Sequence, residues 1–149
     1  MAPGLVPNRT RRFFYDTLNL VFACRRNKYN ATKTTIDGIT FPSKLEADVY
    51  CYLQMLQRGG QIKELKHYDS VALVAKNGNK YRYKPDFRLF DISTNRYVWV
   101  EAKGFETDTW KRNKAAWKLS GPGPLWIFKS SGKRGQIYLC EVVVGPQAI

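Results

Sequence analysis

Two stretches of the sequence decide the fold, KPDF at residues 84–87 and, after a short turn, VWVEAKG at residues 98–104. Both place ionisable side chains where the pattern of a strand otherwise buries hydrocarbon. Because side chains alternate between the two faces of a strand, the second stretch is expected to present Trp99, Glu101 and Lys103 on one face. The opposite face is then entirely apolar. A carboxylate and an ammonium group are thus predicted to point into the same space.

Asp86 is expected to bring a second carboxylate to this place if it ends the preceding strand of a hairpin. Two carboxylates close together repel unless a cation lies between them, and hard divalent ions such as Mg²⁺ prefer oxygen ligands. The spacing therefore predicts a metal site with Lys103 beside it. The competing interpretation is a salt bridge of Lys103 with Asp86 or Glu101 on a solvated sheet surface.

Composition limits the class of protein. With 149 residues, 44% of them hydrophobic, the chain has the length and apolar content of one folded domain. The formal net charge of +13 favours a polyanionic partner, nucleic acid before a membrane surface, and the alternative is a merely soluble basic protein. The three cysteines Cys24, Cys51 and Cys140 are far apart and odd in number, which fits neither a zinc site nor a disulfide framework. A reducing cytoplasm is therefore expected (host cytoplasm if the protein is phage-encoded).

The sequence divides into an N-terminal arm over residues 1–27 and a single domain over residues 28–149. The arm is predicted to carry a short amphipathic helix, because apolar residues recur at helical spacing between pairs of arginines. Asp16 and Asn19 interrupt its apolar run, so a signal peptide is not expected. No stretch of the sequence has the length of a membrane span, and we expect no membrane association.

The remaining elements follow from turn and cap residues and predict an α/β domain. Asp37-Gly38 between β-branched residues predicts a hairpin, and Ser43 with Glu46 forms a capping box for a helix that reaches about Arg58. A strand with an irregularity at residues 69–70 is expected over residues 61–75, followed by a turn at residues 77–78. Beyond the two stretches quoted first, we expect a helix from residue 107 or 108 to about 119, an apolar strand at 125–128 and a last strand at 136–144.

Pro85-Asp86 followed after a hairpin by Glu101-Ala102-Lys103 resembles the P-D…(D/E)-x-K signature of the PD-(D/E)XK nuclease superfamily. The order helix, strands, P-D strand, E-A-K strand, helix and apolar strand is similar to its αβββαβ core. The resemblance covers about residues 28–144, and residues 28–46 look like those of small phage-type endonucleases related to junction-resolving enzymes. It implies a restriction-endonuclease-like core, with a mixed central sheet flanked by helices and a basic N-terminal helical arm.

The resemblance also implies a chemistry, metal-dependent hydrolysis of phosphodiester bonds by an endodeoxyribonuclease. Asp86, Glu101 and the backbone carbonyl of Ala102 could hold Mg²⁺ or Mn²⁺, and Lys103 would orient or activate the attacking water. Glu46 matches the place of a glutamate that often adds or orients a ligand in this superfamily. Its competing role is that of a capping residue alone, and the two roles are compatible. The predicted catalytic residues are therefore Asp86, Glu101, Lys103 and Glu46.

The predicted partner is DNA, most of all branched DNA such as four-way (Holliday) junctions of the kind formed in recombination. Cutting both strands of a junction requires two active sites, which implies a homodimer by analogy with resolvases. The alternatives are a sequence- or lesion-selective nicking or repair nuclease with the same core, and a basic nucleic-acid-binding protein whose carboxylates are structural. Trp110 and Trp117 are expected in the core, with base stacking as their other possible use. The predicted phosphate contacts are Lys84, Lys111, Arg112, Lys114, Lys118, Arg25, Arg26, Lys28 and Lys33.

Overall fold

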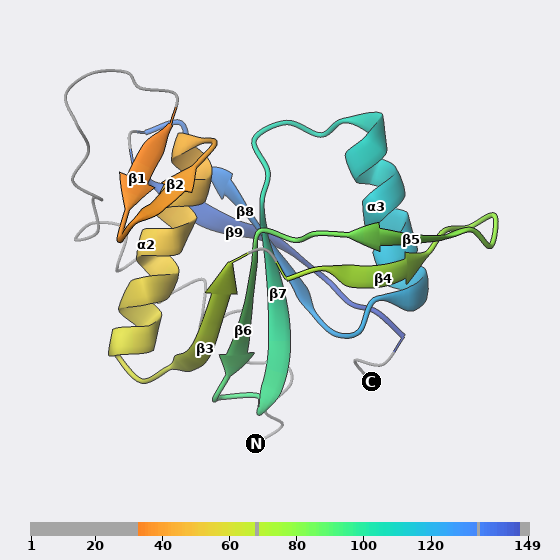
Figure 1. Cartoon of the computed structure of the whole chain (residues 1–149), viewed down its shortest axis with the longest axis horizontal. Helices are drawn as coiled ribbons and strands as arrows, with labels where there is room; N and C mark the ends of the chain where they lie inside the picture. Colours follow the sequence, from red (N-terminus) through yellow and green to blue (C-terminus); the bar gives the residue numbers. More distant parts are fainter. Residues whose placement is uncertain (1–32, 68, 134, 147–149) are drawn as a thin grey trace.

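A computed structural model describes residues 33–67, 69–133 and 135–146 (Figure 1). The predicted amphipathic helix of the N-terminal arm lies outside these residues, and so do three of the predicted phosphate contacts, Arg25, Arg26 and Lys28. No helix of the described part of the chain is long and apolar enough to cross a membrane.

A five-stranded sheet forms the centre of the domain, with the strand order β3-β6-β7-β8-β9. Neighbouring strands run antiparallel except for β7 and β8, which are parallel, so the sheet is mixed. The predicted apolar strand lies between two neighbours in this sheet, as expected for a strand without a polar face. The strands span Ile62–His67 (β3), Phe87–Asp91 (β6), Arg96–Ala102 (β7), Leu125–Ser130 (β8) and Ile137–Val143 (β9).

One face of the sheet is covered by helix α2 (Lys44–Arg58) and by the small hairpin of β1 (Thr34–Ile36) and β2 (Ile39–Phe41) (Figure 1). Ser43 caps α2 as predicted, because its hydroxyl accepts a hydrogen bond from the backbone N–H of Glu46 at 3.1 Å. The apolar stripe of α2 packs on Val98 and Val100 of β7. This is the apolar face of β7 that the alternation of the sequence predicts.

The other face of the sheet carries helix α3 (Asp108–Ser120) and a second hairpin, β4 (Val71–Val74) with β5 (Lys80–Tyr83). Trp117 of α3 stacks edge-on against Trp99 of β7, with 5.7 Å between ring centroids. The indole N–H of Trp117 donates to the carbonyl of Gly123 at 2.8 Å, which ties the glycine- and proline-rich turn to the helix. In Figure 1 the β4–β5 hairpin extends beside α3, away from the central sheet.

The predicted strand over residues 61–75 is corrected by this arrangement. It is two strands, β3 and β4, that belong to different sheets, and the predicted irregularity at residues 69–70 is the point where the chain passes from one to the other. Asp69 at this crossing holds Arg88 of β6 in an ion pair of 2.9 Å.

The other predicted elements are present with bounds within a few residues of those expected. Asp37 and Gly38 take positive φ angles of 51° and 77°, as a tight hairpin turn requires. Without the two hairpins, the chain order is α2, β3, β6, β7, α3, β8 and β9. The expectation that the cysteines form no disulfide is wrong for Cys51, which is disulfide-bonded, whereas Cys140 is a free, exposed thiol.

Candidate functional site

The candidate site lies where β7 ends and β6 begins. Because Phe87 of β6 is paired with Val100 of β7, the preceding Asp86 comes level with the end of β7. The carboxylate of Asp86 accepts a hydrogen bond from the backbone N–H of Ala102 at 2.8 Å. Asp86 is only 7% exposed and Glu101 8% exposed, so the structure buries both predicted carboxylates at one end of the sheet.

Glu101 is held by a side chain from a different sheet. The hydroxyl of Tyr83, at the end of β5, donates to the carboxylate of Glu101 at 2.7 Å, and the contact is buried. Tyr83 itself packs against Trp110 and Trp117 of α3. The β4–β5 hairpin and α3 therefore fix the orientation of a carboxylate that β7 carries.

Burial dominates the electrostatics of Asp86. Together with repulsion from Glu101 and with the hydrogen bond and the charge of Glu46, burial raises the pKa of Asp86 to about 10. The N–H of Ala102 opposes this rise. A carboxyl group that is hard to ionise in this way is stabilised when it binds a proton or another cation.

The pKa of Glu101 is raised less than that of Asp86, because more neighbouring groups stabilise its ionised form. Burial raises its pKa to about 7, against the hydrogen bond from Tyr83 and the positive charge of Lys103, which both lower it. The two carboxylates thus titrate as interacting groups in different surroundings. Glu101 has a hydroxyl donor and a cation nearby, whereas Asp86 has a backbone N–H donor.

Glu46 joins the two predicted carboxylates from the start of α2. It is 7% exposed, and a hydrogen bond to Asp86 is one of the causes that raise the pKa of Asp86. Glu46 is therefore buried next to Asp86 while its backbone N–H is bonded to the Ser43 cap. His67 lies at the end of β3 between Phe41 and Phe87, where burial lowers its pKa and the charge of Glu46 opposes that effect.

Lys103 follows the last residue of β7 and is half-buried beside this acidic pair. Its backbone N–H donates to the carbonyl of Phe128 at 2.9 Å, which continues the pairing of β7 with β8. Its Nζ atom lies 5.5 Å from the centroid of the Trp110 ring. The face of an aromatic ring attracts an ammonium group and so restricts its position. Its charge also lowers the pKa of Glu101, which places the ammonium group close enough to act on that carboxylate.

The carboxylates of Asp86 and Glu101 offer oxygen atoms, the kind of ligand that Mg²⁺ takes. In residues 33–67, 69–133 and 135–146, no group of three or more His, Cys, Asp and Glu side chains is placed to hold a metal ion. Mg²⁺ commonly binds through one or two carboxylates and keeps several waters. Asp86, Glu101 and the Ala102 carbonyl could provide such a partial set, and the mutual repulsion of the acids would be relieved by it.

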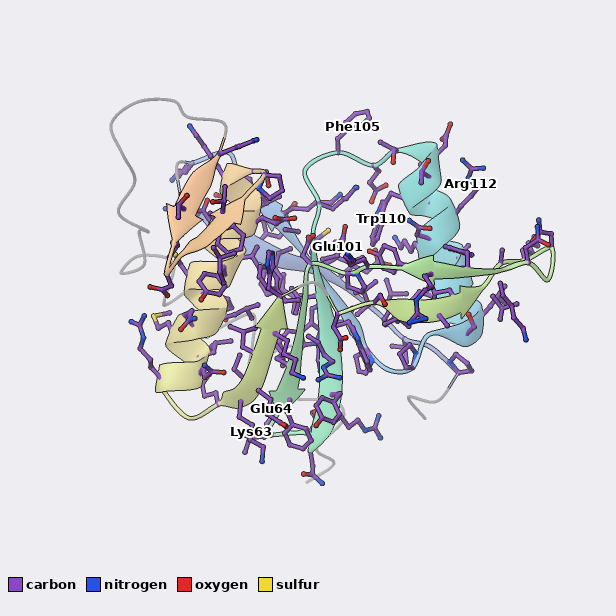
Figure 2. All side chains as sticks on the ribbon, in the orientation of Figure 1. Lys63, Glu64, Glu101, Phe105, Trp110 and Arg112 are labelled. Carbon is purple, nitrogen blue, oxygen red and sulfur yellow. The ribbon has the colours of Figure 1, made fainter. Side chains whose placement is uncertain are left out.

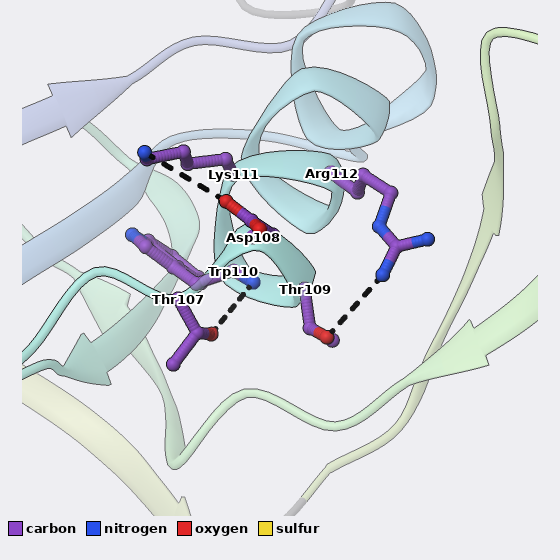
Figure 3. Close-up of polar contacts among 6 residues, drawn as sticks. All are labelled: Thr107, Asp108, Thr109, Trp110, Lys111 and Arg112. Atoms are coloured by element: carbon purple, nitrogen blue, oxygen red, sulfur yellow. Dashed lines mark hydrogen bonds and ion pairs between the residues drawn. The ribbon is translucent and has the colours of Figure 1, made fainter.

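The predicted phosphate contacts do not form one group. Lys33 and Lys84 are exposed, as are Lys111, Arg112 and Lys118 of α3. Lys114 instead pairs with Glu141 of β9 at 2.5 Å. The start of α3 is shown in Figure 3, where Lys111 contacts Asp108 at 3.9 Å and Arg112 contacts the hydroxyl of Thr109 at 3.5 Å.

The two tryptophans of α3 are core residues. Trp110 is 1% exposed and Trp117 is fully buried, so neither offers a face to a nucleic-acid base. The prediction that they belong to the core is confirmed, and the stacking alternative does not hold for them.

Tyr83 is the site residue that the sequence prediction missed. A signal for it was present, because Tyr81 and Tyr83 alternate along β5 and Tyr83 stands only three residues before Asp86. Strand alternation places both tyrosines on one face, but it does not say which carboxylate the hydroxyl reaches.

Replacing Tyr83 with phenylalanine is expected to destabilise the metal-free protein more at pH 8.5 than at pH 5.5. The hydroxyl donates to the ionised form of Glu101 and lowers its pKa, so its contribution is present above that pKa and is lost as the pH falls through about 7. At the higher pH we expect a loss of about 1–3 kcal/mol in the free energy of unfolding. Urea unfolding in EDTA at both pH values measures it.

Tyr81→Phe is the matched control, because the hydroxyl of Tyr81 donates to the neutral side chain of Asn113 at 2.9 Å. Its loss should not depend on pH over the same range. An equal loss at both pH values for Tyr83→Phe would show that the ionisation of Glu101 is not coupled to this hydrogen bond.

The fold and the site define a class, an α/β protein with a mixed five-stranded sheet and a buried acidic pair beside a lysine at the end of one central strand. Residues 26–132 match the family described as "Protein of unknown function (DUF1064)", and the chain belongs to this family. The match contains both carboxylates, Lys103 and Tyr83. No curated protein and no solved structure matches the chain.

Proposed function

We propose that the protein is a metal-dependent DNA endonuclease that hydrolyses phosphodiester bonds. One observation carries the proposal: Asp86 and Glu101 are buried together at the end of β7, with Lys103 half-buried beside them. Burying two acids at one point costs stability unless a cation compensates them. A structural salt bridge on a solvated sheet, the competing interpretation, does not account for this burial.

The order α2, β3, β6, β7, α3, β8 and the parallel pairing of β7 with β8 support a restriction-endonuclease-like core. In such a core the P-D and E-A-K segments lie on adjacent strands, and here Asp86 directly precedes β6 while Glu101 lies on the neighbouring β7. The β4–β5 hairpin is an addition between β3 and β6 that supplies Tyr83.

Bound Mg²⁺ or Mn²⁺ would neutralise charge at the scissile phosphate and lower the pKa of a coordinated water. The chain contributes the rest. Asp86 is kept in place by the N–H of Ala102 and Glu101 by Tyr83, and the two carboxylates would hold the cation. Lys103 donates a hydrogen bond to the attacking water or to a phosphate oxygen, and Glu46 positions Asp86.

Exposed cations would provide the DNA contacts. Lys84 stands two residues before Asp86, and Lys111, Arg112 and Lys118 are exposed on α3. Together with the net charge of +13 they favour a partner with a phosphate backbone. Such contacts position DNA without reading its sequence, which suits recognition of shape. We therefore propose branched DNA as the substrate and a homodimer as the form that cuts both strands.

The test incubates the full chain with labelled linear duplex, single strand and four-way junction, with Mg²⁺, Mn²⁺ or EDTA, beside Asp86→Asn and Lys103→Ala. We expect paired, metal-dependent cuts near the branch point that both substitutions abolish. Cutting of every substrate would keep the endonuclease and remove the preference for junctions. Binding without cleavage in the presence of either metal would refute the proposed endonuclease activity and would leave a basic DNA-binding protein.

A further inference from the structure

Phe105 is the most exposed of the large hydrophobic residues that the structure describes. Its side chain is 77% exposed, against 54% for the next, Leu119. It stands in the loop between β7 and α3, two residues after Lys103. In Figure 2 the labelled ring lies at the outer edge of this loop and points away from the body of the domain. An aromatic ring left in water at this position forgoes the stabilisation that burial would give it.

The exposure of Phe105 is not a consequence of a loose loop, because both sides of it are fixed. Before it, the backbone N–H of Lys103 is bonded to Phe128 of β8. After it, the carboxylate of Glu106 contacts the Nζ atom of Lys129 at 3.3 Å, and Thr107 caps α3 by accepting from the N–H of Trp110 at 3.1 Å (Figure 3). The loop therefore presents the ring outward from two anchored ends.

The surroundings of Phe105 suit a nucleic-acid strand. The two acidic neighbours, Glu106 and Asp108, each contact a lysine, and Arg112 contacts the hydroxyl of Thr109. Lys103 stands two residues before Phe105. An exposed aromatic ring can stack on an unpaired base while cations in the same site contact phosphates.

Distance along the chain sets where such a base would lie. Phe105 is the fourth residue after Glu101, so their Cα atoms are at most about 14 Å apart. With about 3.4 Å between successive phosphates along the axis of one strand, the ring reaches a base within roughly four nucleotides of the phosphate at the acidic pair. In an intact duplex that base is paired and stacked on its neighbours, whereas at a branch point or in a single strand its face is free.

We propose that Phe105 stacks on an unpaired base next to the scissile phosphate and so selects DNA that is branched or locally single-stranded. The inference rests on the proposed function for the position of the phosphate, and it names the structural feature of the substrate. Trp110 and Trp117 cannot perform this role because both are buried.

The test uses the full chain in EDTA, where no cutting is expected, and DNA junctions with 2-aminopurine at successive positions around the branch. We expect a change in fluorescence confined to a few positions near the branch, absent in Phe105→Ala and retained in Phe105→Trp. Affinity for the junction should fall on the order of tenfold in Phe105→Ala, while affinity for linear duplex stays the same. Leu119→Ala, the next most exposed hydrophobic residue, is the control and should bind as the unaltered protein does.

Equal fluorescence changes in Phe105→Ala and the unaltered chain would overturn the inference, as would an equal loss of affinity for junction and linear duplex. A shift in oligomeric state on sedimentation, without loss of junction affinity, would identify Phe105 as a contact between copies of the chain and would also overturn it. Because binding is read in EDTA, the outcome is separate from whether the protein cuts. A fluorescence change at specific bases, with no cleavage under Mg²⁺, would support the stacking role of Phe105 and refute the proposed nuclease activity.

Discussion

Replacing Lys103 with methionine is expected to lower the rate of metal-dependent cleavage by about 10²- to 10⁴-fold, which is the range for a positioned proton donor or a charge that stabilises the transition state. Methionine keeps an unbranched apolar chain beside the Trp110 ring, which the Nζ atom of Lys103 faces at 5.5 Å. The substitution therefore removes the charge while preserving most of the packing. Junction affinity measured in EDTA should change by less than about tenfold, because one phosphate contact of several is lost.

Lys63→Met is the matched control for this experiment. Lys63 also places its Nζ atom over an aromatic ring, 4.9 Å from the centroid of Phe90. Figure 2 shows Lys63 at the opposite end of the sheet from Glu101. Its variant should cut at the rate of the unaltered protein. Cleavage that is equally fast in both variants would remove Lys103 from the proposed mechanism and would leave its charge as a structural partner of Glu101.

Replacing Asp86 with asparagine is expected to stabilise the metal-free protein while it removes the response to metal. Burial and the neighbouring acids raise the pKa of Asp86 from 3.8 to about 10, so folding at pH 7 requires this group to be protonated or to hold an unfavourable charge. About three pH units lie between 3.8 and 7, which sets an upper limit of about 4 kcal/mol at 1.36 kcal/mol per unit. Asparagine keeps an oxygen for the N–H of Ala102 and carries no charge.

The sign of the pH dependence follows from the raised pKa. The carboxyl group contributes no penalty below about pH 4, and its cost to folding grows as the pH rises from there toward 10. The melting temperature of Asp86→Asn in EDTA should therefore equal that of the unaltered chain near pH 4 and exceed it by roughly 5–10 °C at pH 8. Adding Mn²⁺ or Mg²⁺ should raise the melting temperature of the unaltered chain and leave the variant unchanged, because only the former binds the ion.

Asp91→Asn is the control for a buried acid outside the site. Asp91 accepts hydrogen bonds from the backbone N–H and hydroxyl of Ser93 and from the hydroxyl of Thr94, at 3.1, 2.8 and 2.8 Å. Its carboxylate is thus satisfied by donors, and the substitution should destabilise the protein at neutral pH. If Asp86→Asn destabilised the protein as much as Asp91→Asn does, the acidic cluster would be a structural network that needs no cation.

The sequence by itself determined the elements whose signals are local. Caps at Ser43 and Thr107 fix where the two described helices begin, because each hydroxyl reaches a backbone N–H three residues ahead. Alternation along residues 98–103 determined that Glu101 and Trp99 share a face, since the period of two is a property of the strand alone. The apolar run at residues 125–128 predicted an inner strand of the sheet, and β8 is one.

Only the tertiary structure decided what surrounds the acids. That Tyr83 from the β4–β5 hairpin donates to Glu101, and that Glu46 from α2 meets Asp86, depends on elements from separate parts of the chain converging at one end of the sheet. No local pattern carries this information, and so the sequence predicted one continuous strand where β3 and β4 separate. The raised pKa of Asp86 has the same origin, because burial is a property of the packed domain and not of the residue. Phe105 is the converse case, an apolar residue whose exposure is visible only once both ends of its loop are anchored.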